Sequence, residues 1–224
     1  MNIKVFVIHY KKLVERKEHI LNEFKKNNII NYEFVEIDRD DIQKFDLSIF
    51  ENDFIIKYKA PNIAILLSHI YAYTEISKYY DCGLIFEDDV ILSSNFNNIF
   101  DNCLKQLPTT YDMLFIGGGC NLHIPKSMLK EDTFIYRKGT EETEWGGNGC
   151  TRCVDSYLVS KKCASQLTNY IELIKQGKNK KINILSDWWL NIVAKELNFE
   201  VYWAEPTIVT QGSHNNTFLC SYSI

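Results

Sequence analysis

Short apolar segments alternate with longer amphipathic segments along the first half of the chain, and this alternation constrains the fold more than any other feature. Strand-like patterns occupy residues 3–8, 32–37, 84–86 and 112–116. Helical patterns occupy residues 13–26, a stretch from Pro61 to about residue 80, and a stretch that Ser94 can cap. Strands and helices in regular alternation are typical of an α/β protein.

The second half of the chain continues the pattern after an irregular middle. Residues 120–152 are rich in glycine and are interpreted as loops with a short β-like piece at 134–136. Strands are expected at 154–159 and 199–203, and helices at 161–175 and 187–197, the last with Ser186 as its N-cap. With no internal repeat and no linker-like composition, residues 1–224 are predicted to form a single domain.

The composition indicates which class of protein the chain belongs to and which partners it can bind. Hydrophobic residues make up 46% and charged residues 24% of the chain, as in ordinary globular proteins. The net charge of −4 argues against a nucleic-acid partner, because no basic excess exists to neutralise phosphates. The N-terminal apolar run is too short for a signal peptide and no segment is long enough to span a membrane, so a cytoplasmic location is expected.

The segment GLIFEDDV, Gly83–Val90, places three consecutive carboxylates at the end of a predicted buried strand. Ligands of open α/β sheets bind outside the carboxyl ends of the strands, where Glu87, Asp88 and Asp89 should fall. A hard divalent cation would relieve the mutual repulsion of these acids and is a natural partner of a diphosphate. The alternative is that the acids cap the next helix or face water.

Other motifs carry weaker signals. The chain has neither G-x-x-x-x-G-K-[ST] nor G-x-G-x-x-G after a strand, so P-loop and dinucleotide-binding functions lose their main support. Cys150 and Cys153 supply only two of the four ligands that zinc needs. Asp187 follows a good N-cap, so the helix dipole would favour its ionised form and suit a general base. His214 is either an exposed loop residue or a phosphate or metal contact.

Taken together, several segments resemble glycosyltransferase family 25. The similar stretches are VFVIHYKKLVERKEHI, NIAILLSHIYAY, GLIFEDDV, DSYLVSKKCASQL, and SDWWLN followed by VYWAEPTIVTQGS. The resemblance spans residues 3–213 and weakens across 42–58 and 121–151. Ala64 and Ile65 depart from the pattern, since the family commonly has Gly and Cys ahead of the Ser-His pair.

The resemblance implies a GT-A type fold, that is, a nucleotide-sugar-binding, Rossmann-like α/β sandwich with a mixed central sheet, using Mn²⁺ or Mg²⁺ and a UDP-sugar. Asp89 is the first candidate for direct metal contact, with Glu87 and His214 as further metal contacts. Glu87 and Asp88 would hold the ribose or a metal-bound water. Asp187 would be the catalytic base of an inverting single displacement.

The same resemblance implies the rest of the donor and acceptor sites. Arg16, Ser68 and His69 would contribute to the donor pocket, although a lone histidine in a buried helix is by default a core residue. Tryptophans 145, 188 and 189 are candidates for stacking on sugars, with core packing the alternative for at least one of the adjacent pair. The sugar would be a hexose, galactose or glucose, and the acceptor a glycan, a lipid-linked saccharide or a protein hydroxyl.

Two other functions compete with sugar transfer. A non-catalytic module of the same fold would bind a nucleotide sugar or a glycan and use the acids only for a structural cation. A metal-dependent nucleotidyl or phosphoryl transferase also uses acids at strand ends. Intact GLIFEDDV and Asp187 argue against the first, and the lack of a Lys- or Arg-rich phosphate loop near the acids argues against the second.

Overall fold

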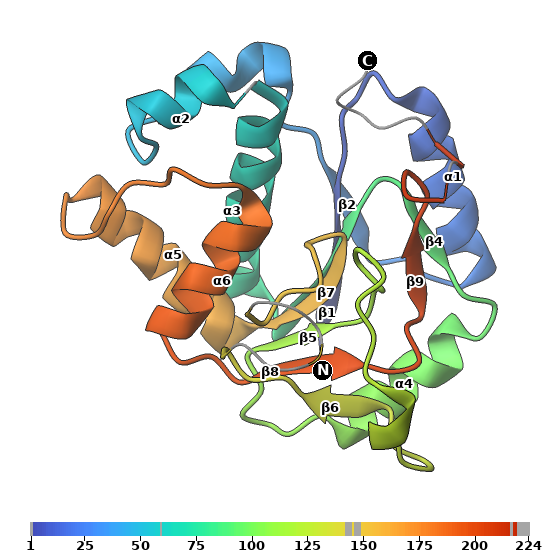
Figure 1. Ribbon diagram of the computed structural model, residues 1–224. Helices are drawn as coiled ribbons and strands as arrows, with labels where there is room; N and C mark the ends of the chain where they lie inside the picture. The colour runs from blue at the N-terminus through green and yellow to red at the C-terminus, as the bar shows by residue number, and fades with distance from the viewer. Residues whose placement is uncertain (1, 59, 142–144, 146–148, 216, 219–224) are drawn as a thin grey trace.

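A mixed seven-stranded sheet forms the centre of the computed structural model, which describes residues 2–58, 60–141, 145, 149–215 and 217–218 (Figure 1). The sheet order is β2-β1-β3-β7-β5-β8-β6. The strands are β1 (Ile3–Ile8), β2 (Tyr32–Val35), β3 (Cys82–Glu87), β5 (Met113–Phe115), β6 (Ile135–Arg137), β7 (Ser156–Ser160) and β8 (Val201–Ala204). The predicted α/β class with a mixed central sheet is confirmed.

The sheet is mixed because β7 runs antiparallel to both of its neighbours, β3 and β5. By contrast, β1 is parallel to β2 and β3, and β5 is parallel to β8. The β-like piece at 134–136 is the edge strand β6, which pairs antiparallel with β8 rather than forming a hairpin. A separate small sheet joins β4 (Val90–Leu92) to β9 (Val209–Gln211), and the sequence patterns predicted neither strand.

Helices cover both faces of the central sheet (Figure 1). The helices α3 (Ala60–Tyr79), α5 (Lys161–Lys175) and α6 (Ser186–Glu196) contribute to one core, together with the short α2 (Asn52–Lys57). The helices α1 (Val14–Lys26) and α4 (Phe96–Gln106) contribute to the other. Alternate residues of β1 divide between the two cores, since successive strand side chains point to opposite faces.

Two predicted helix caps are wrong in detail. Ser186 is the first residue of α6 rather than its cap, and the cap position is held by Leu185, whose side chain makes no capping hydrogen bond. The cap of α4 is Asn95 rather than Ser94. The short 3₁₀ helices η1 (Arg39–Lys44) and η2 (Lys126–Met128) complete the described elements. None of the helices in the described part of the chain is long and apolar enough to cross a membrane.

The topology brings four segments that are distant in the sequence to one edge of the sheet. Ile8 and Glu87 are register partners, so the carboxyl ends of β1 and β3 lie side by side. The amino end of β7 reaches the same edge because that strand is antiparallel, and the amide of Glu87 donates to the carbonyl of Asp155 at 2.8 Å. β9 brings the tail alongside, where the amide of Gly212 donates to the carbonyl of Asp89.

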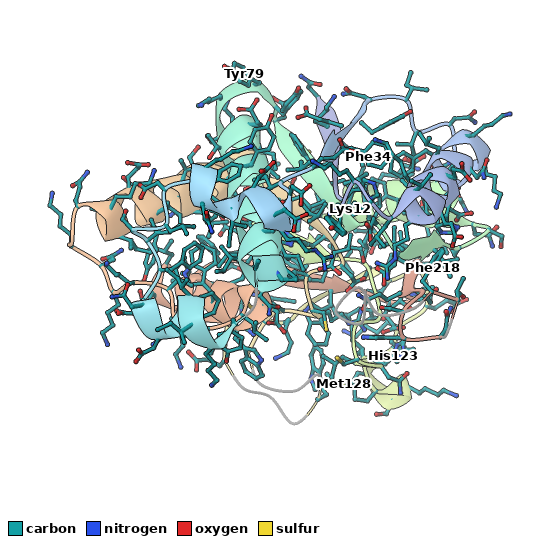
Figure 2. All side chains as sticks on the ribbon, turned by 90° about the horizontal axis from the view of Figure 1, so that it is seen from above. Lys12, Phe34, Tyr79, His123, Met128 and Phe218 are labelled. Atoms are coloured by element: carbon teal, nitrogen blue, oxygen red, sulfur yellow. The ribbon has the colours of Figure 1, made fainter. Side chains whose placement is uncertain are left out.

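The tail after β9 continues toward α1. Seen from above, Phe218 lies beside α1 (Figure 2), with its ring centroid 5.1 Å from that of His19 and 5.5 Å from the guanidinium carbon of Arg16. The tail therefore closes one side of the region beyond the acidic strand end.

Candidate active site

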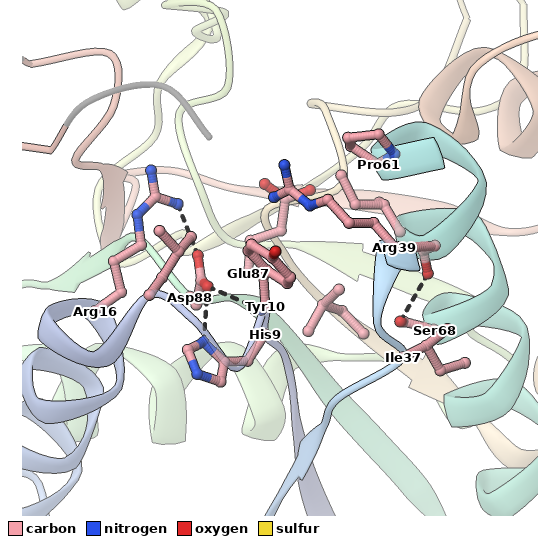
Figure 3. A pocket seen from close by; sticks show the side chains of 13 residues that line it. His9, Tyr10, Arg16, Ile37, Arg39, Pro61, Ser68, Glu87 and Asp88 are labelled. Atoms are coloured by element: carbon pink, nitrogen blue, oxygen red, sulfur yellow. Dashed lines mark hydrogen bonds and ion pairs between the residues drawn. The ribbon is translucent and has the colours of Figure 1, made fainter. Parts of the chain in front are cut away.

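Two adjoining pockets lie at this edge of the sheet. The larger has a volume of about 390 Å³, and its lining includes Asp89, Asp155, Asp187 and His214. The smaller is lined by residues from β1, the loops that follow β1 and β2, and the first turns of α3 (Figure 3). Arg16, Ile65 and Glu87 line both, so the pockets form one connected site. The larger volume lies within the range of small-molecule sites.

Asp88 is held by positive and polar groups from the N-terminal segment. The guanidinium of Arg16 donates to its Oδ1 at 2.7 Å, and the ring Nδ1 of His9 lies 2.8 Å from its Oδ2 (Figure 3). The backbone amide of Tyr10 also donates to Oδ2. Because both carboxylate oxygens have protein partners and the side chain is buried, Asp88 fixes the end of β3 against β1 and α1.

Asp89 has a carboxylate oxygen without a partner. Its Oδ2 accepts a hydrogen bond from the amide of Ser213 at 3.2 Å and lies 3.9 Å from the guanidinium of Arg16. Its Oδ1 has no hydrogen-bond partner among the described residues, although Asp89 is only 2% exposed. A buried, unsatisfied carboxylate oxygen is costly, so this atom is a candidate ligand for a cation.

Glu87 lies in a field of like charge. Burial raises its pKa well above the ordinary value, and the carboxylates of Asp89, Asp155 and Asp88 raise it further, while Arg16 opposes the shift. The side-chain amide of Gln211 donates to Oε2 at 3.2 Å. The acidic side chains predicted at the carboxyl end of this strand therefore lie close together in the structure, and their proximity disfavours the ionised form of Glu87.

Asp155 is a site residue that sequence reasoning missed. It is buried, lines the larger pocket and accepts a hydrogen bond from the Ser156 hydroxyl, while its Oδ1 has no partner among the described residues. Burial raises its pKa to about 7. Asp155 lies at the amino end of an antiparallel strand, whereas the rule for open α/β sheets points to the carboxyl ends of the strands. An acid directly ahead of a buried strand is the signal that was available.

Asp187 lines the larger pocket from the first turn of α6. Burial raises its pKa above the ordinary value, and hydrogen bonds from the backbone amides of Trp188 and Asp187 itself oppose the rise. The backbone amides at the helix terminus favour the ionised form, as predicted, but burial outweighs them and the net pKa lies above the ordinary value. A raised pKa still suits a general base, whose pKa works best near the operating pH.

The remaining predicted residues divide between the pockets and the core. His214 lines the larger pocket, and Ser68 lines the smaller, where its hydroxyl donates to the carbonyl of Ala64. His69 lies deeper, 1% exposed, with Nδ1 2.8 Å from the Tyr157 hydroxyl, and lines neither pocket. The structure therefore does not bring His69 to the predicted donor wall.

The three tryptophans predicted to stack on sugars differ in their exposure to solvent. Trp189 is buried and its ring packs against Tyr170, as the core alternative predicted for one of the adjacent pair. Trp188 is 45% exposed beside Asp187. Trp145 makes an edge contact with the ring of the buried Trp203. Of the three, Trp188 has the exposure that contact with a sugar requires.

The oxygen atoms available from these side chains suit a hard cation that is coordinated by both protein and ligand, rather than one coordinated by protein side chains alone. Within the described residues, no three His, Cys, Asp or Glu side chains are grouped closely enough to hold a metal alone. Mg²⁺ sites in nucleotide enzymes commonly use one or two carboxylates and complete their coordination with water and substrate phosphates. The unpartnered oxygen of Asp89 and the like charge around Glu87 meet that requirement.

Comparison with known proteins supplies the family. The sequence model of glycosyltransferase family 25, described as LPS biosynthesis protein, matches residues 2–184. The chain belongs to glycosyltransferase family 25. This glycosyltransferase has the α/β architecture with a mixed central sheet that the resemblance implied. Among curated protein sequences, no match was found.

Solved structures similar to this family 25 glycosyltransferase include other sugar transferases. A Drosophila β1,4-galactosyltransferase 7 variant in complex with manganese, UDP-Gal and xylobiose is 13% identical, with 98% of this chain and 76% of that chain covered and a TM-score of 0.44. Galactosyltransferase LgtC in complex with donor and acceptor sugar analogues is 10% identical, with coverages of 94% and 86% and a TM-score of 0.44. At these scores they assign no residue roles in this glycosyltransferase.

Proposed function

We propose that this glycosyltransferase moves a hexose, galactose or glucose, from a UDP-sugar to an acceptor hydroxyl with inversion, and that residues 1–224 act as one catalytic domain. The acceptor is a glycan, a lipid-linked saccharide or a protein. The observation that carries the proposal is the unpartnered carboxylate oxygen of Asp89, buried at the wall of a pocket that Asp187 also lines.

Mn²⁺ or Mg²⁺ would be held by Asp89 together with the diphosphate of the donor. Glu87 and His214 line the same pocket and are proposed as further contacts, although the described side chains are not grouped closely enough to hold the ion without the ligand. The ion supplies Lewis-acid stabilisation of the negative charge that develops on the leaving UDP. Asp155 extends the acidic wall from the segment before β7, where it is suited to accept hydrogen bonds from sugar hydroxyls.

The smaller pocket suits the nucleoside. Its lining is largely apolar, and the guanidinium of Arg39 lies 3.8 Å from the ring centroid of Tyr10, which gives a flat wall for a planar base (Figure 3). Arg16 lines both pockets and carries positive charge at their junction, where a diphosphate would cross from the base to the sugar. Asp88 holds that arginine in place.

Asp187 would remove the proton from the acceptor hydroxyl as that oxygen attacks the anomeric carbon. It approaches the larger pocket from α6, whereas the acids of the metal site approach from β3. A base and a leaving-group site on different elements suit a single displacement, in which the acceptor enters opposite the leaving UDP. The exposed Trp188 offers the acceptor an aromatic surface.

Release of UDP from UDP-galactose and UDP-glucose, with and without Mn²⁺, tests the proposal. Wild-type protein should release UDP from one of these donors only with the metal, and Asp89→Asn and Asp187→Asn should each lose this activity. Asp101→Asn, an exposed acid on α4, is the matched control and should retain it. Metal-dependent UDP binding without turnover for any sugar and acceptor mixture would instead favour the non-catalytic module.

A further inference from the structure

Two thiols face each other at the wall of the larger pocket. The sulfurs of Cys120 and Cys153 lie 3.4 Å apart, although the residues are 33 positions apart in the sequence. Cys120 lies in the loop that follows β5, and Cys153 lies just before β7. Both line the same pocket as Asp89 and Asp187. Sugar transfer as proposed uses neither thiol.

The backbone holds these two thiols in place. Cys120 has a φ of 47° and Cys153 a φ of 58°, so both lie in the left-handed region that residues other than glycine seldom adopt. Gly119 packs so closely on the carbonyl of Arg152 that a β-carbon there would collide with it. Because the two loops touch through their backbones, the juxtaposition of the sulfurs does not depend on side-chain rotation alone.

The pair also differs in accessibility from the other cysteines that the structure describes. Cys120 is exposed and Cys153 half-buried, whereas Cys82, Cys103, Cys150 and Cys163 are buried. Burial, together with the neighbouring Cys120 thiol, raises the pKa of Cys153. An oxidant from solvent therefore meets Cys120 first, and Cys153 is placed to react with the product.

We propose that Cys120 and Cys153 form a reversible dithiol–disulfide modification site on the wall of the larger pocket. With a peroxide as oxidant, the Cys120 thiolate attacks one oxygen, giving a sulfenic acid and, with a proton, water. The Cys153 sulfur then attacks the Cys120 sulfur, so that the S–S bond forms and a second water leaves. Two thiols lose two electrons and the peroxide gains them. A small thiol reverses the change by exchange.

Oxidation has a geometric consequence for the pocket. A disulfide bond is about 2.05 Å long, so the sulfurs must approach by roughly 1.4 Å from their present separation. The bond ties the loop after β5 to the segment before β7 and fixes the wall next to Asp155. The inference that this change weakens UDP binding rests on the proposed function, whereas formation of the crosslink does not.

Mass spectrometry tests the crosslink. Protein treated with hydrogen peroxide, blocked with N-ethylmaleimide and digested should yield one peptide pair joined through Cys120 and Cys153, which separates on reduction. Cys120→Ser and Cys153→Ser should each lack it. Accumulation of sulfinic acid at Cys120 without the crosslink, or crosslinking that involves the buried cysteines instead, would overturn the proposal.

Calorimetry of UDP binding with Mn²⁺ tests the effect on the site. Oxidation should weaken binding by about tenfold, within the usual range for coupled sites, and dithiothreitol should restore it. Cys120→Ser protein, treated in the same way, should keep the affinity of its own untreated sample. A crosslink with unchanged affinity would overturn control of the site by oxidation. Absence of binding by the reduced wild type would refute the proposed function and leave the crosslink result unaffected.

Discussion

His69 offers a stringent test of the placement of the Ser-His pair, because burial at this position has a measurable pH signature. Its Nδ1 lies 2.8 Å from the hydroxyl of Tyr157, which in turn lies 2.6 Å from that of Tyr73, and its Nε2 has no hydrogen-bond partner among the described residues. Burial lowers the pKa of His69 to about 3. The folded protein therefore keeps this ring neutral at pH values where the unfolded chain binds a proton.

The sign and size of the effect follow from proton linkage. Between pH 6.5 and about 3 the unfolded state binds a proton at His69 that the folded state does not, so stability is lost as the pH falls through this window. The full shift corresponds to about 5 kcal/mol, of which about 2 kcal/mol is lost between pH 7 and pH 5. Glu87 and Asp155 act in the opposite direction, because burial raises their pKa values.

The informative quantity is therefore the difference between wild type and His69→Gln, in which the contributions of the acids cancel. Urea unfolding at pH 7, 6 and 5 gives this difference. The free-energy advantage of wild type over the variant should shrink by about 2 kcal/mol from pH 7 to pH 5. His123→Gln, the same change at an exposed ring, shows how much pH dependence any histidine replacement introduces.

The prediction is wrong if the difference in unfolding free energy between wild type and His69→Gln stays constant within about 0.5 kcal/mol across this pH range. A histidine that is neutral when folded and protonated when unfolded must make stability depend on pH there. The same variant should bind UDP with wild-type affinity at pH 7, since His69 lines neither pocket. A loss of UDP affinity without loss of stability would indicate that His69 contributes to the donor pocket.

Three further predictions test the packing and the chemistry of the site. Gly119→Ala should lower the free energy of unfolding by about 2 kcal/mol because the new methyl meets the Arg152 carbonyl, while Gly118→Ala, whose nearest neighbour lies 3.7 Å away, should change it little; equal effects in thermal unfolding would contradict the close approach of the loops. Asp88→Asn should cost on the order of 3 kcal/mol by urea unfolding, because it removes the carboxylate charge that lies 2.7 Å from a buried guanidinium, and a cost near zero would show that the ion pair is unimportant. The acid limb of kcat/KM should lie above the pKa of an ordinary aspartate, because activity is lost as Asp187 is protonated; a limb near pH 3.8 would exclude this residue as the base.

Local periodicity was sufficient for most of the fold. The strands of the central sheet, the longer helices and the acidic end of β3 were predicted from residue patterns, because apolar runs and helical periodicity are visible within each segment. The strand order in the sheet was not predictable, since pairing depends on contacts far apart in the sequence. β4 and β9 were not predicted, although β5 and β6, which are equally short, were.

Within the site, the residue types were predictable and their partners were not. Asp88 and Asp89 are adjacent acids, yet one is paired with Arg16 and the other keeps a carboxylate oxygen without a partner among the described residues. Ser68 and His69 are adjacent on a helix, where successive side chains point about 100° apart, so one lines a pocket and the other enters the core. Such differences depend on the direction of each side chain, which sequence spacing alone does not fix.

The central claim is that the acidic strand end binds the nucleotide through a divalent cation. Calorimetric titration of UDP into wild-type protein and Asp89→Asn, each with Mn²⁺ and with a chelator, measures this directly. UDP should bind wild type only with Mn²⁺, and the substitution should abolish that dependence together with the affinity. UDP binding that is equally strong with the chelator and in Asp89→Asn would contradict the account and make the acidic strand end a structural feature.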